Sequence, residues 1–407
     1  LKYNKCLGKF KLDDFDVHKS KVRDLIFKAV RLRLRSDVPV GTCLSGGIDS
    51  STIAVTINEI LKKMKIPQVG ERQKVFTACY KNSNIDESFF AEKVVKQTNT
   101  EWHRTYPTAK ELLKDLLDLI YYQEEPFGST SIYAQYRVIK LAKNRCIKVL
   151  LDGQGGDELF TGYQSFYAPY FLDLLKNLKL RQIVREVLNL KNSPINLKNL
   201  IVQIVRVLSA KYLLPKLKVK ILSKIQPELK YVNKTFLRKF LERDPAKLAV
   251  STSLNETCYI WFTGHNLQQL LKYEDRNSMA HSIEARVPFS DDVELVEYVF
   301  SIPAIYKIHN GWSKYILREA MADLLPKEVR FRTDKIGFAT PERDWLIEIK
   351  DELKKLIDWE NPYIDTKKLI KDFDKLLERL PASGLNTLWR LINTVLWMRV
   401  FDVKPPD

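Results

Sequence analysis

The feature that most constrains this chain is the alternation of short apolar runs with amphipathic stretches over residues 21–160. Short runs bounded by turn residues indicate buried strands, and apolar residues spaced three and four apart indicate helices. Strands and helices that alternate in this way form a parallel sheet with helices on both faces. We therefore predict an α/β fold with a doubly wound parallel sheet. Its predicted strands are residues 39–44, 75–80, 101–106 and 147–151, and its predicted helices are residues 20–34, 52–65, 86–97, 109–121 and 131–144.

The pattern changes after about residue 164, where only helical spacing continues, apart from predicted loops at 284–292 and 331–341. The sheet is thus expected to be followed by a mainly helical C-terminal part. We divide the chain into a linker remnant at residues 1–20, an α/β core at 21–163, a basic helical insert at 164–250 and a helical part at 251–407 that completes the domain.

Charge is concentrated in the insert. The whole chain carries a net charge of +17, and residues 164–250 hold 18 Lys or Arg against 5 Asp or Glu, a net of +13. The rest of the chain therefore carries only +4, which is no signal for a nucleic-acid partner. We interpret the positive charge of the insert as a solvated surface, and the alternative is that it binds an acidic partner.

Two further properties bound the class of protein. No apolar run reaches the roughly 18 residues that cross a bilayer, so we expect no membrane partner. The five cysteines are odd in number and lack CxxC spacing, which argues against disulfides and a thiolate zinc site and fits a reducing, cytoplasmic location. The chain opens on Leu1 rather than Met, and we expect a segment to precede it.

The first predicted strand runs into a loop, residues 44–51, that opens a helix. Gly46 and Gly47 let the backbone pass close to a ligand, and free N–H groups at the helix start form an anion cradle with the neighbouring hydroxyls. Asp49 inside such a cradle would repel a phosphate unless a cation lies between them, which indicates Mg²⁺. The alternative is a Gly-Gly turn with a serine that caps the helix.

A second glycine-rich loop, residues 152–163, follows the buried strand at 147–151. The ends of parallel strands converge, so Asp157 in this loop is expected to share one Mg²⁺ with Asp49. Glu158 beside it is a further candidate oxygen ligand. The alternative is that both carboxylates only complement the dipole of the helix that follows.

Several motifs in this order resemble one family. SGGIDSS after a strand is similar to the pyrophosphate-binding loop of the N-type ATP pyrophosphatases. With the later motifs, the chain resembles the synthetase domain of glutamine-hydrolysing asparagine synthetase over roughly residues 20–163 and 255–400; the insert matches only in being helical. The later motifs are DGQGGDELFTGY, YEDRNSMA with SIEARVPF, WSKYILREA and RTDKIGF.

The resemblance implies an adenine-nucleotide α-hydrolase-like fold and a reaction. In the family, the side-chain carboxylate of aspartate attacks the α-phosphate of ATP, pyrophosphate leaves with Mg²⁺, and ammonia displaces AMP from the β-aspartyl adenylate. Metal ligation is implied for Asp49 and Asp157. The implied phosphate-binding residues are Ser45, Gly46, Gly47, Asp49, Ser50 and Ser51, and the implied nucleotide contacts are Leu44, Ala78 and Gly153.

Four charged residues are expected to help stabilise the negative charge that develops in the transition state. Lys335 matches the lysine that neutralises charge on the α-phosphate and pyrophosphate, and Asp291 is expected to hold it by a charge-assisted hydrogen bond. Lys314 and Arg318, one helical turn apart, are expected to support the same anion.

The chain departs from the family in three positions of these motifs and at its front. Gln154 stands where many members have a glutamate near the acyl adenylate, and an amide cannot act as a base. Asp152 replaces the usual serine and Ser290 the usual leucine. No glutaminase domain lies within the sequence, and Cys6 is internal, so ammonia is expected from an upstream domain, a partner subunit or solution. A homodimer is left open.

Other functions keep the same first loop. The nearest are relatives that act on another carboxylate, such as β-lactam synthetase-like enzymes, lasso-peptide cyclase-like enzymes and amidotransferases of cell-surface precursors. A tRNA-modifying pyrophosphatase would suit the basic insert but usually lacks the IEARVPF and DKIGF segments. A non-enzymatic scaffold would require a dead site, whereas Asp49, Asp157 and Lys335 are all present.

Overall fold

The computed structural model describes residues 1–81, 83–212, 227–242, 251–333 and 339–404. Five parallel strands form one sheet in the order β3-β2-β1-β4-β5. The central pair sets the register, with Val40 beside Val149. The doubly wound parallel sheet predicted from the sequence is confirmed. The strands are β1 (Val40–Cys43), β2 (Lys74–Ala78), β3 (Glu101–Thr105), β4 (Val149–Leu151) and β5 (Glu284–Arg286).

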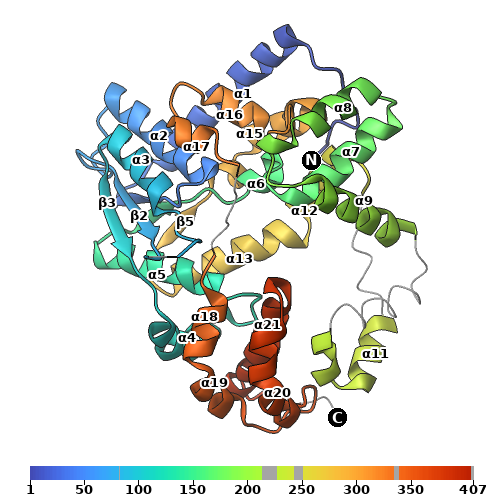
Figure 1. Ribbon diagram of the computed structural model, residues 1–407. Coiled ribbons are helices and arrows are strands. Elements are labelled where there is room, and N and C mark those ends of the chain that lie inside the picture. Colours follow the sequence, from blue (N-terminus) through green and yellow to red (C-terminus); the bar gives the residue numbers. More distant parts are fainter. Residues whose placement is uncertain (82, 213–226, 243–250, 334–338, 405–407) are drawn as a thin grey trace.

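Helices cover both faces of the sheet (Figure 1). Because successive side chains of a strand point to opposite faces, Val149 and Leu151 join the core beside α2 and α3, whereas Leu150 packs in the core beside α5. The helices predicted around the sheet are present. They are α1 (Leu12–Arg33), α2 (Ile48–Lys63), α3 (Ser88–Thr98), α4 (Ala109–Gln123) and α5 (Ser131–Asn144).

Two sequence predictions differ from the structure. The chain after residue 164 is not helical only, because β5 lies inside the predicted loop 284–292 and pairs with β4. A strand of three residues, Glu-Ala-Arg, is too short to show the alternation that marks strands. Helix α1 begins at Leu12 rather than residue 20, and both Leu7 and Phe15 are buried, so the predicted linker remnant contributes to the fold.

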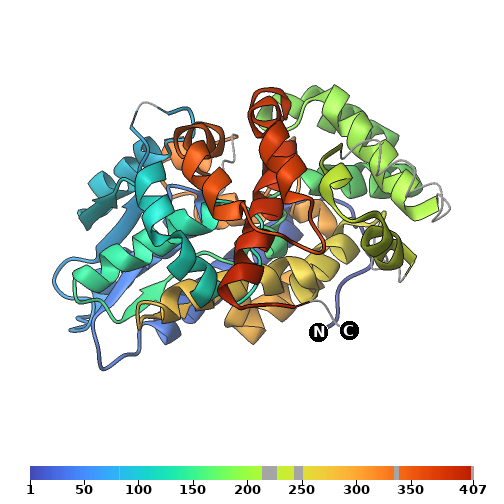
Figure 2. The same ribbon diagram turned by 90° about the horizontal axis from the view of Figure 1, so that it is seen from below.

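Of the remaining helices, α13–α17 pack against the helices that cover the sheet, and two further groups lie beyond them. The C-terminal helices α18–α21 build a second core with α4 and α5, while α7–α9 lie on the side of the molecule away from the sheet (Figures 1 and 2). No described helix is long and apolar enough to cross a membrane. The α-helices of this part are α6 (Gly156–Phe160), α7 (Tyr167–Lys176), α8 (Leu180–Leu188), α9 (Leu197–Tyr212), α11 (Lys234–Glu242), α12 (Leu254–Thr263), α13 (His265–Met279), α14 (Pro288–Asp291), α15 (Val293–Ser301), α16 (Tyr315–Ala320), α17 (Lys327–Arg330), α18 (Glu342–Glu348), α19 (Lys350–Ile357), α20 (Thr366–Arg379) and α21 (Ala382–Val400).

Candidate active site

The two glycine-rich loops meet at the carboxyl ends of the neighbouring strands β1 and β4. Their backbones are so close that a Cβ added at Gly156 would lie 2.6 Å from Oδ1 of Asp49, and one added at Gly153 would lie 2.9 Å from the Cβ of Asp49. A larger residue at either position would push the loops apart. The close approach therefore requires the glycines and brings the two sequence motifs into one site.

The loop between β1 and α2 is held in shape by its own polar groups. Gly46 has φ +82°, which side chains rarely adopt, and a Cβ there would meet the Ala91 nitrogen at 2.7 Å. The hydroxyls of Ser45 and Ser50 lie 3.0 Å apart, and the Gly47 N–H donates to Oγ of Ser45. Both hydroxyls therefore sit at the open start of α2, where an anion would bind.

A buried ammonium links the two loops. Nζ of Lys314 forms ion pairs with Asp49 and with Oδ1 of Asp157, the latter at 2.7 Å, and only 5% of its side chain is exposed. Burial lowers the pKa of Lys314, and the charge of Asp49 opposes that shift. The predicted convergence of the two aspartates is present, around a cation that the protein itself supplies.

The loops, Lys314 and the helices around them enclose a cavity of about 300 Å³. Predicted site residues that line it are Ser45, Gly47, Asp49, Ser50, Gly153, Gln154, Asp157 and Lys314. Ser51 is predicted to bind phosphate but is completely buried, and it does not line this cavity. Lining residues that the sequence prediction omits include Glu87, Ser131, Tyr163, Ser313 and Arg332.

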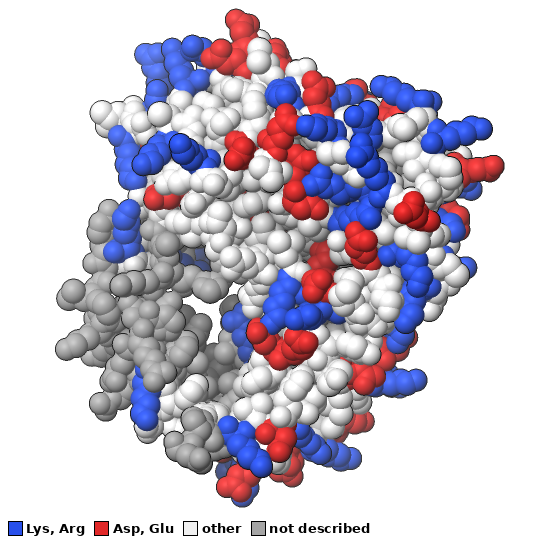
Figure 3. Space-filling model, turned by 180° about the vertical axis from the view of Figure 1, so that it is seen from behind, with Lys and Arg blue, Asp and Glu red and all other residues white. Residues whose placement is uncertain are grey.

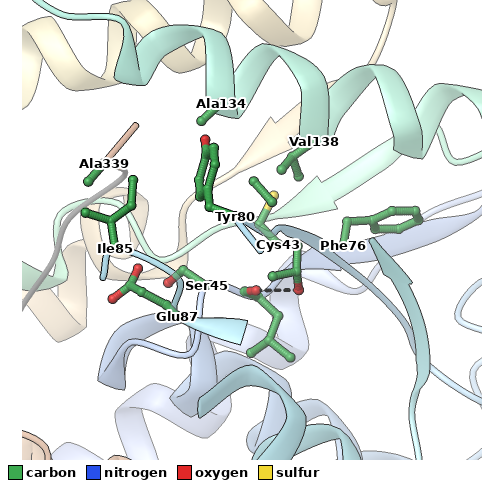
Figure 4. Close-up of a pocket in the computed structure, with 12 residues that line it drawn as sticks. Cys43, Ser45, Phe76, Tyr80, Ile85, Glu87, Ala134, Val138 and Ala339 are labelled. Atoms are coloured by element: carbon green, nitrogen blue, oxygen red, sulfur yellow. Dashed lines mark hydrogen bonds between the residues drawn. The ribbon is translucent and has the colours of Figure 1, made fainter. Parts of the chain in front are cut away.

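A narrow, mostly apolar slot adjoins the cavity and shares Ser45 and Glu87 with it (Figure 4). Leu44 and Ala78, which the resemblance assigns to nucleotide contacts, both line the slot. The hydroxyl of Thr77 donates to the carbonyl oxygen of Leu44 at 2.7 Å and fixes the strand end. A slot whose described lining residues include no cation, beside a cavity with charged side chains, is an arrangement that suits a base with attached phosphates.

Arg332 is the main cavity residue for which the sequence suggested no role. Its guanidinium pairs with Glu87 at 2.6 Å and lies 4.0 Å from the ring centroid of Phe90. Only 4% of its side chain is exposed. The signal was available, since Arg332 opens the RTDKIGF motif, whereas nothing in the sequence marked Glu87.

Three further residues had predicted roles in charge stabilisation, and the structure places one of them, Arg318, at the cavity. Lys335 lies outside the described residues, and so does its predicted contact with Asp291. The described partner of Asp291 is Arg33, at 2.8 Å, and Asp291 does not line the cavity. Arg318 lines the cavity together with Lys314, and its guanidinium donates to the carbonyl oxygens of Ser313 and Arg332, so that it also holds the loops that carry other site residues.

Glu158 is also not placed as a ligand. Its Oε1 accepts hydrogen bonds from the hydroxyl of Tyr163 at 2.8 Å and from the amide of Asn266 at 2.6 Å. Burial raises the pKa of Glu158. Its hydrogen bond fixes the position of Tyr163, which lines the cavity.

A pair of buried carboxyls lies at the wall of the cavity, where Asp152 is one of the lining residues. Asp152 accepts from the N–H of Gly153 at 2.5 Å, and the carboxyl of Glu274 on α13 lies close enough to that of Asp152 to interact with it electrostatically. Burial raises the pKa of both, well above the usual range for Glu274, where the charge of Asp152 adds to the effect. Gln154 lies near Glu274 as well and lowers its pKa, against the effect of burial. Two of the three departures from the family pattern thus meet at one carboxyl.

Comparison with known proteins agrees with this geometry. The family model described as asparagine synthase matches residues 21–399. The chain belongs to the asparagine synthase family. All the site loops described above lie within the matched range.

Curated relatives in the asparagine synthase family are similar at modest identity. Asparagine synthetase [glutamine-hydrolyzing] 1 of Bacillus subtilis is 30% identical over 340 residues, which cover 80% of this chain and 50% of that protein. Asparagine synthetase [glutamine-hydrolyzing] 3 of the same organism is 27% identical over 91% of this chain and 56% of its own length. An amidase of Penicillium rubens is 24% identical over 94% of this chain and 62% of its own length. The chain spans about half the length of the curated relatives it matches.

The site of this asparagine synthase family member can be tested for its fit to Mg²⁺. The described residues contain no group of three or more His, Cys, Asp or Glu side chains that would hold a metal ion alone. Mg²⁺ instead usually takes one or two carboxylates together with substrate phosphates and water. Asp49 and Asp157, drawn to one cation at the cavity wall, fit that mode of binding.

Proposed function

We propose that the protein is an ATP-dependent amide-forming ligase that makes asparagine from aspartate and releases AMP and pyrophosphate. The observation that carries the proposal is that a slot lined by Leu44 and Ala78 adjoins a cavity that holds the charged side chains of Asp49, Asp157 and Lys314. Membership of the asparagine synthase family supports the same conclusion.

The first step is adenylation. A side-chain oxygen of aspartate forms a bond to the α-phosphorus of ATP, and the bond from that phosphorus to the bridging oxygen breaks, with its electron pair leaving on pyrophosphate. Charge on the leaving group must be neutralised, and fixed cations in a buried site do this best. Lys314 and Arg332 line the cavity for this purpose, and Lys335 is proposed to join them. Asp49 and Asp157 would hold Mg²⁺, which supplies further positive charge to the phosphates.

The serine loop positions the nucleotide for this step. The hydroxyls of Ser45 and Ser50 and the N–H groups at the start of α2 face the cavity and bind phosphate oxygens. The adenosine part occupies the slot at Leu44 and Ala78. Gly153 keeps the second loop close enough to narrow the cavity around the α-phosphate.

The second step forms the amide. The lone pair of ammonia attacks the acyl carbon of the β-aspartyl adenylate, and AMP leaves with the oxygen that had come from aspartate. Gln154 lines the cavity at the position proposed to face this acyl group, where it orients the group but takes no proton. Ammonia comes from glutamine through a glutaminase domain or subunit upstream, or from solution.

The experiment is an assay of pyrophosphate release with ATP, Mg²⁺ and ammonium, over a panel of carboxylates. Release that depends on aspartate supports the proposal, and its absence with aspartate overturns the assignment of the acceptor. The variant Lys335→Ala should abolish release while the circular dichroism spectrum stays unchanged. Retained release in Lys335→Ala would remove that lysine from the mechanism.

A second candidate function keeps adenylation and changes the acceptor. It is favoured by Gln154, an amide that lines the cavity near the buried Glu274, at the position where the family commonly has a carboxylate. The amidase-named relative fits this alternative only loosely. In the same assay, this candidate predicts release with another carboxylate of the panel and little with aspartate.

A further inference from the structure

Exposed aliphatic side chains are concentrated in one segment of the chain, whose helices α8 and α9 both pack against α7. Of the 26 large hydrophobic residues that are exposed among the described residues, ten lie between residues 175 and 208. They are Leu175, Leu178, Leu180, Val184, Leu188, Leu197, Ile201, Val202, Val205 and Leu208. We call them, with the basic residues between 176 and 211, the α8–α9 surface.

The spacing of these residues makes stripes along the two helices. Leu180, Val184 and Leu188 are four apart on α8, and Ile201 and Val205 are four apart on α9, so each set shares one helix face. A folded helix that keeps such a stripe exposed has a partner surface missing.

The charge of the same segment has one sign. Residues 164–212 contain eight Lys or Arg and two acidic residues, Asp173 and Glu186, and both acidic residues are buried. The exposed charge of α8 and α9 is therefore entirely positive. Elsewhere, the face in Figure 3 shows basic and acidic side chains interspersed.

Helix α8 is fixed firmly to the body of the protein. The carboxylate of Glu186 accepts hydrogen bonds from the N–H groups of Asn310 at 3.0 Å and Gly311 at 2.7 Å. Residues 310 and 311 immediately precede the segment that carries Lys314. One side of α8 thus anchors the helix next to the active site, and the other side presents the aliphatic stripe.

We propose that the α8–α9 surface binds the face of an anionic lipid bilayer. Helices with an aliphatic stripe flanked by lysines and arginines bury the stripe at the boundary between headgroups and acyl chains, while the cations contact anionic headgroups. The sequence-based expectation of no membrane partner rested on the absence of a spanning segment, and a surface contact needs none. This inference goes beyond the proposed function and does not rest on it.

Other occupants fit the surface less well. Single-stranded nucleic acid is bound by aromatic side chains on which bases stack, and every exposed apolar residue between 175 and 208 is aliphatic. A second copy of the chain joined through the same surface would place positive charges opposite one another. An anionic bilayer satisfies both the aliphatic and the positive groups.

The test is sedimentation of the full chain with vesicles of phosphatidylcholine, with or without phosphatidylglycerol. We expect binding to the anionic vesicles, weak binding to pure phosphatidylcholine and release at high salt. The variant Val184→Asp with Leu188→Asp should lower binding at least about tenfold, since it places charge on the inserting stripe. Ile201→Asp with Val205→Asp tests α9 in the same way.

The matched control is Val293→Asp with Leu117→Asp, which changes two exposed aliphatic residues elsewhere by the same charge. It should bind like the parent protein, and circular dichroism should show that every variant is folded. Absence of binding to anionic vesicles, unchanged binding in both helix variants, or an equal loss in the control would overturn the proposal. A dimer that only the helix variants dissociate, without vesicle binding, would do the same and assign the surface to a second copy.

Discussion

The loops at the ends of β1 and β4 and the α8–α9 surface handle charge in opposite ways. In the loops, one buried ammonium, Lys314, is matched by Asp49 and Asp157. On α8 and α9, all exposed charge is positive and lies beside uncovered aliphatic residues. In the loops, the positive charge is thus paired with acidic groups of the protein itself. On the α8–α9 surface, we propose that it pairs with an external anionic partner.

The difference shows why net charge alone misleads about function. Most of the excess of +17 comes from residues 164–250, but Lys314 and Arg332, the described positive groups proposed for catalysis, are single, buried side chains at the cavity. Substitutions in the first region should therefore change activity and stability strongly, and substitutions in the second should change neither. Four predictions test this contrast, from the largest effect to the smallest.

Loss of one compensating carboxylate should have the largest effect. Asp49→Asn removes a proposed Mg²⁺ ligand and one partner of Lys314, so pyrophosphate release should fall by about 10²–10³-fold. Asp14→Asn, which removes the partner of Lys11 in an exposed ion pair, is the control and should leave release unchanged. Comparable activity in Asp49→Asn and the parent protein would separate Asp49 from the chemistry.

Loss of the ammonium should destabilise the fold. In Lys314→Ala two buried carboxylates face each other without a cation, and we expect the free energy of unfolding to fall by about 3–5 kcal/mol. Urea denaturation measures this free energy. Lys11→Ala is the control: both members of the Lys11–Asp14 ion pair are exposed, so the free energy of unfolding should fall by less than about 1 kcal/mol. Mg²⁺ should stabilise Lys314→Ala more than the parent protein. A lack of stabilisation of Lys314→Ala by Mg²⁺ would contradict a metal site at these carboxylates.

The buried carboxyl pair predicts a pH dependence of intermediate size. The pKa of Glu274 in the folded state lies well above its ordinary value of 4.5, mainly because of burial. The folded state therefore binds protons more tightly than the unfolded state, so this stability is present at low pH and is lost as the pH rises above 4.5 towards the folded pKa. The free energy of unfolding should fall as the pH rises above about 4.5 in the parent protein and fall less in Glu274→Gln. A control variant, Glu348→Gln on an exposed position of α18, should keep the parent slope; a parent slope in Glu274→Gln would show that the pair does not titrate in this range.

The smallest effect is expected on the exposed surface. Val184 is 58% exposed on α8, so Val184→Asp should change the free energy of unfolding by no more than about 0.5 kcal/mol. Pyrophosphate release in solution should also stay at the parent level. A large loss of stability would show that the stripe of α8 is packed against the protein, and the contrast between the two regions would fail.

The sequence predicted most of the sheet and the two loops because apolar periodicity within a strand or helix, and glycine-rich turns, are local signals. It missed β5, because three residues carry no periodicity, and Glu87, because its place at the cavity depends on pairing with the distant Arg332. Lys314 was expected to face an anion of the substrate, yet its partners are two aspartates of the protein. Contacts between residues far apart in the chain are determined by tertiary packing, which rules based on sequence spacing do not describe.

The most direct test of the proposed reaction follows an oxygen atom. Aspartate labelled with ¹⁸O in its side-chain carboxylate would be incubated with the protein, ATP, Mg²⁺ and ammonium, and AMP would be analysed by mass spectrometry. Attack of that carboxylate on the α-phosphorus, followed by attack of ammonia on the acyl carbon, leaves one labelled oxygen in each AMP. The account predicts this singly labelled AMP together with asparagine and pyrophosphate. Asparagine formed with unlabelled AMP, or with the label in inorganic phosphate, would contradict it.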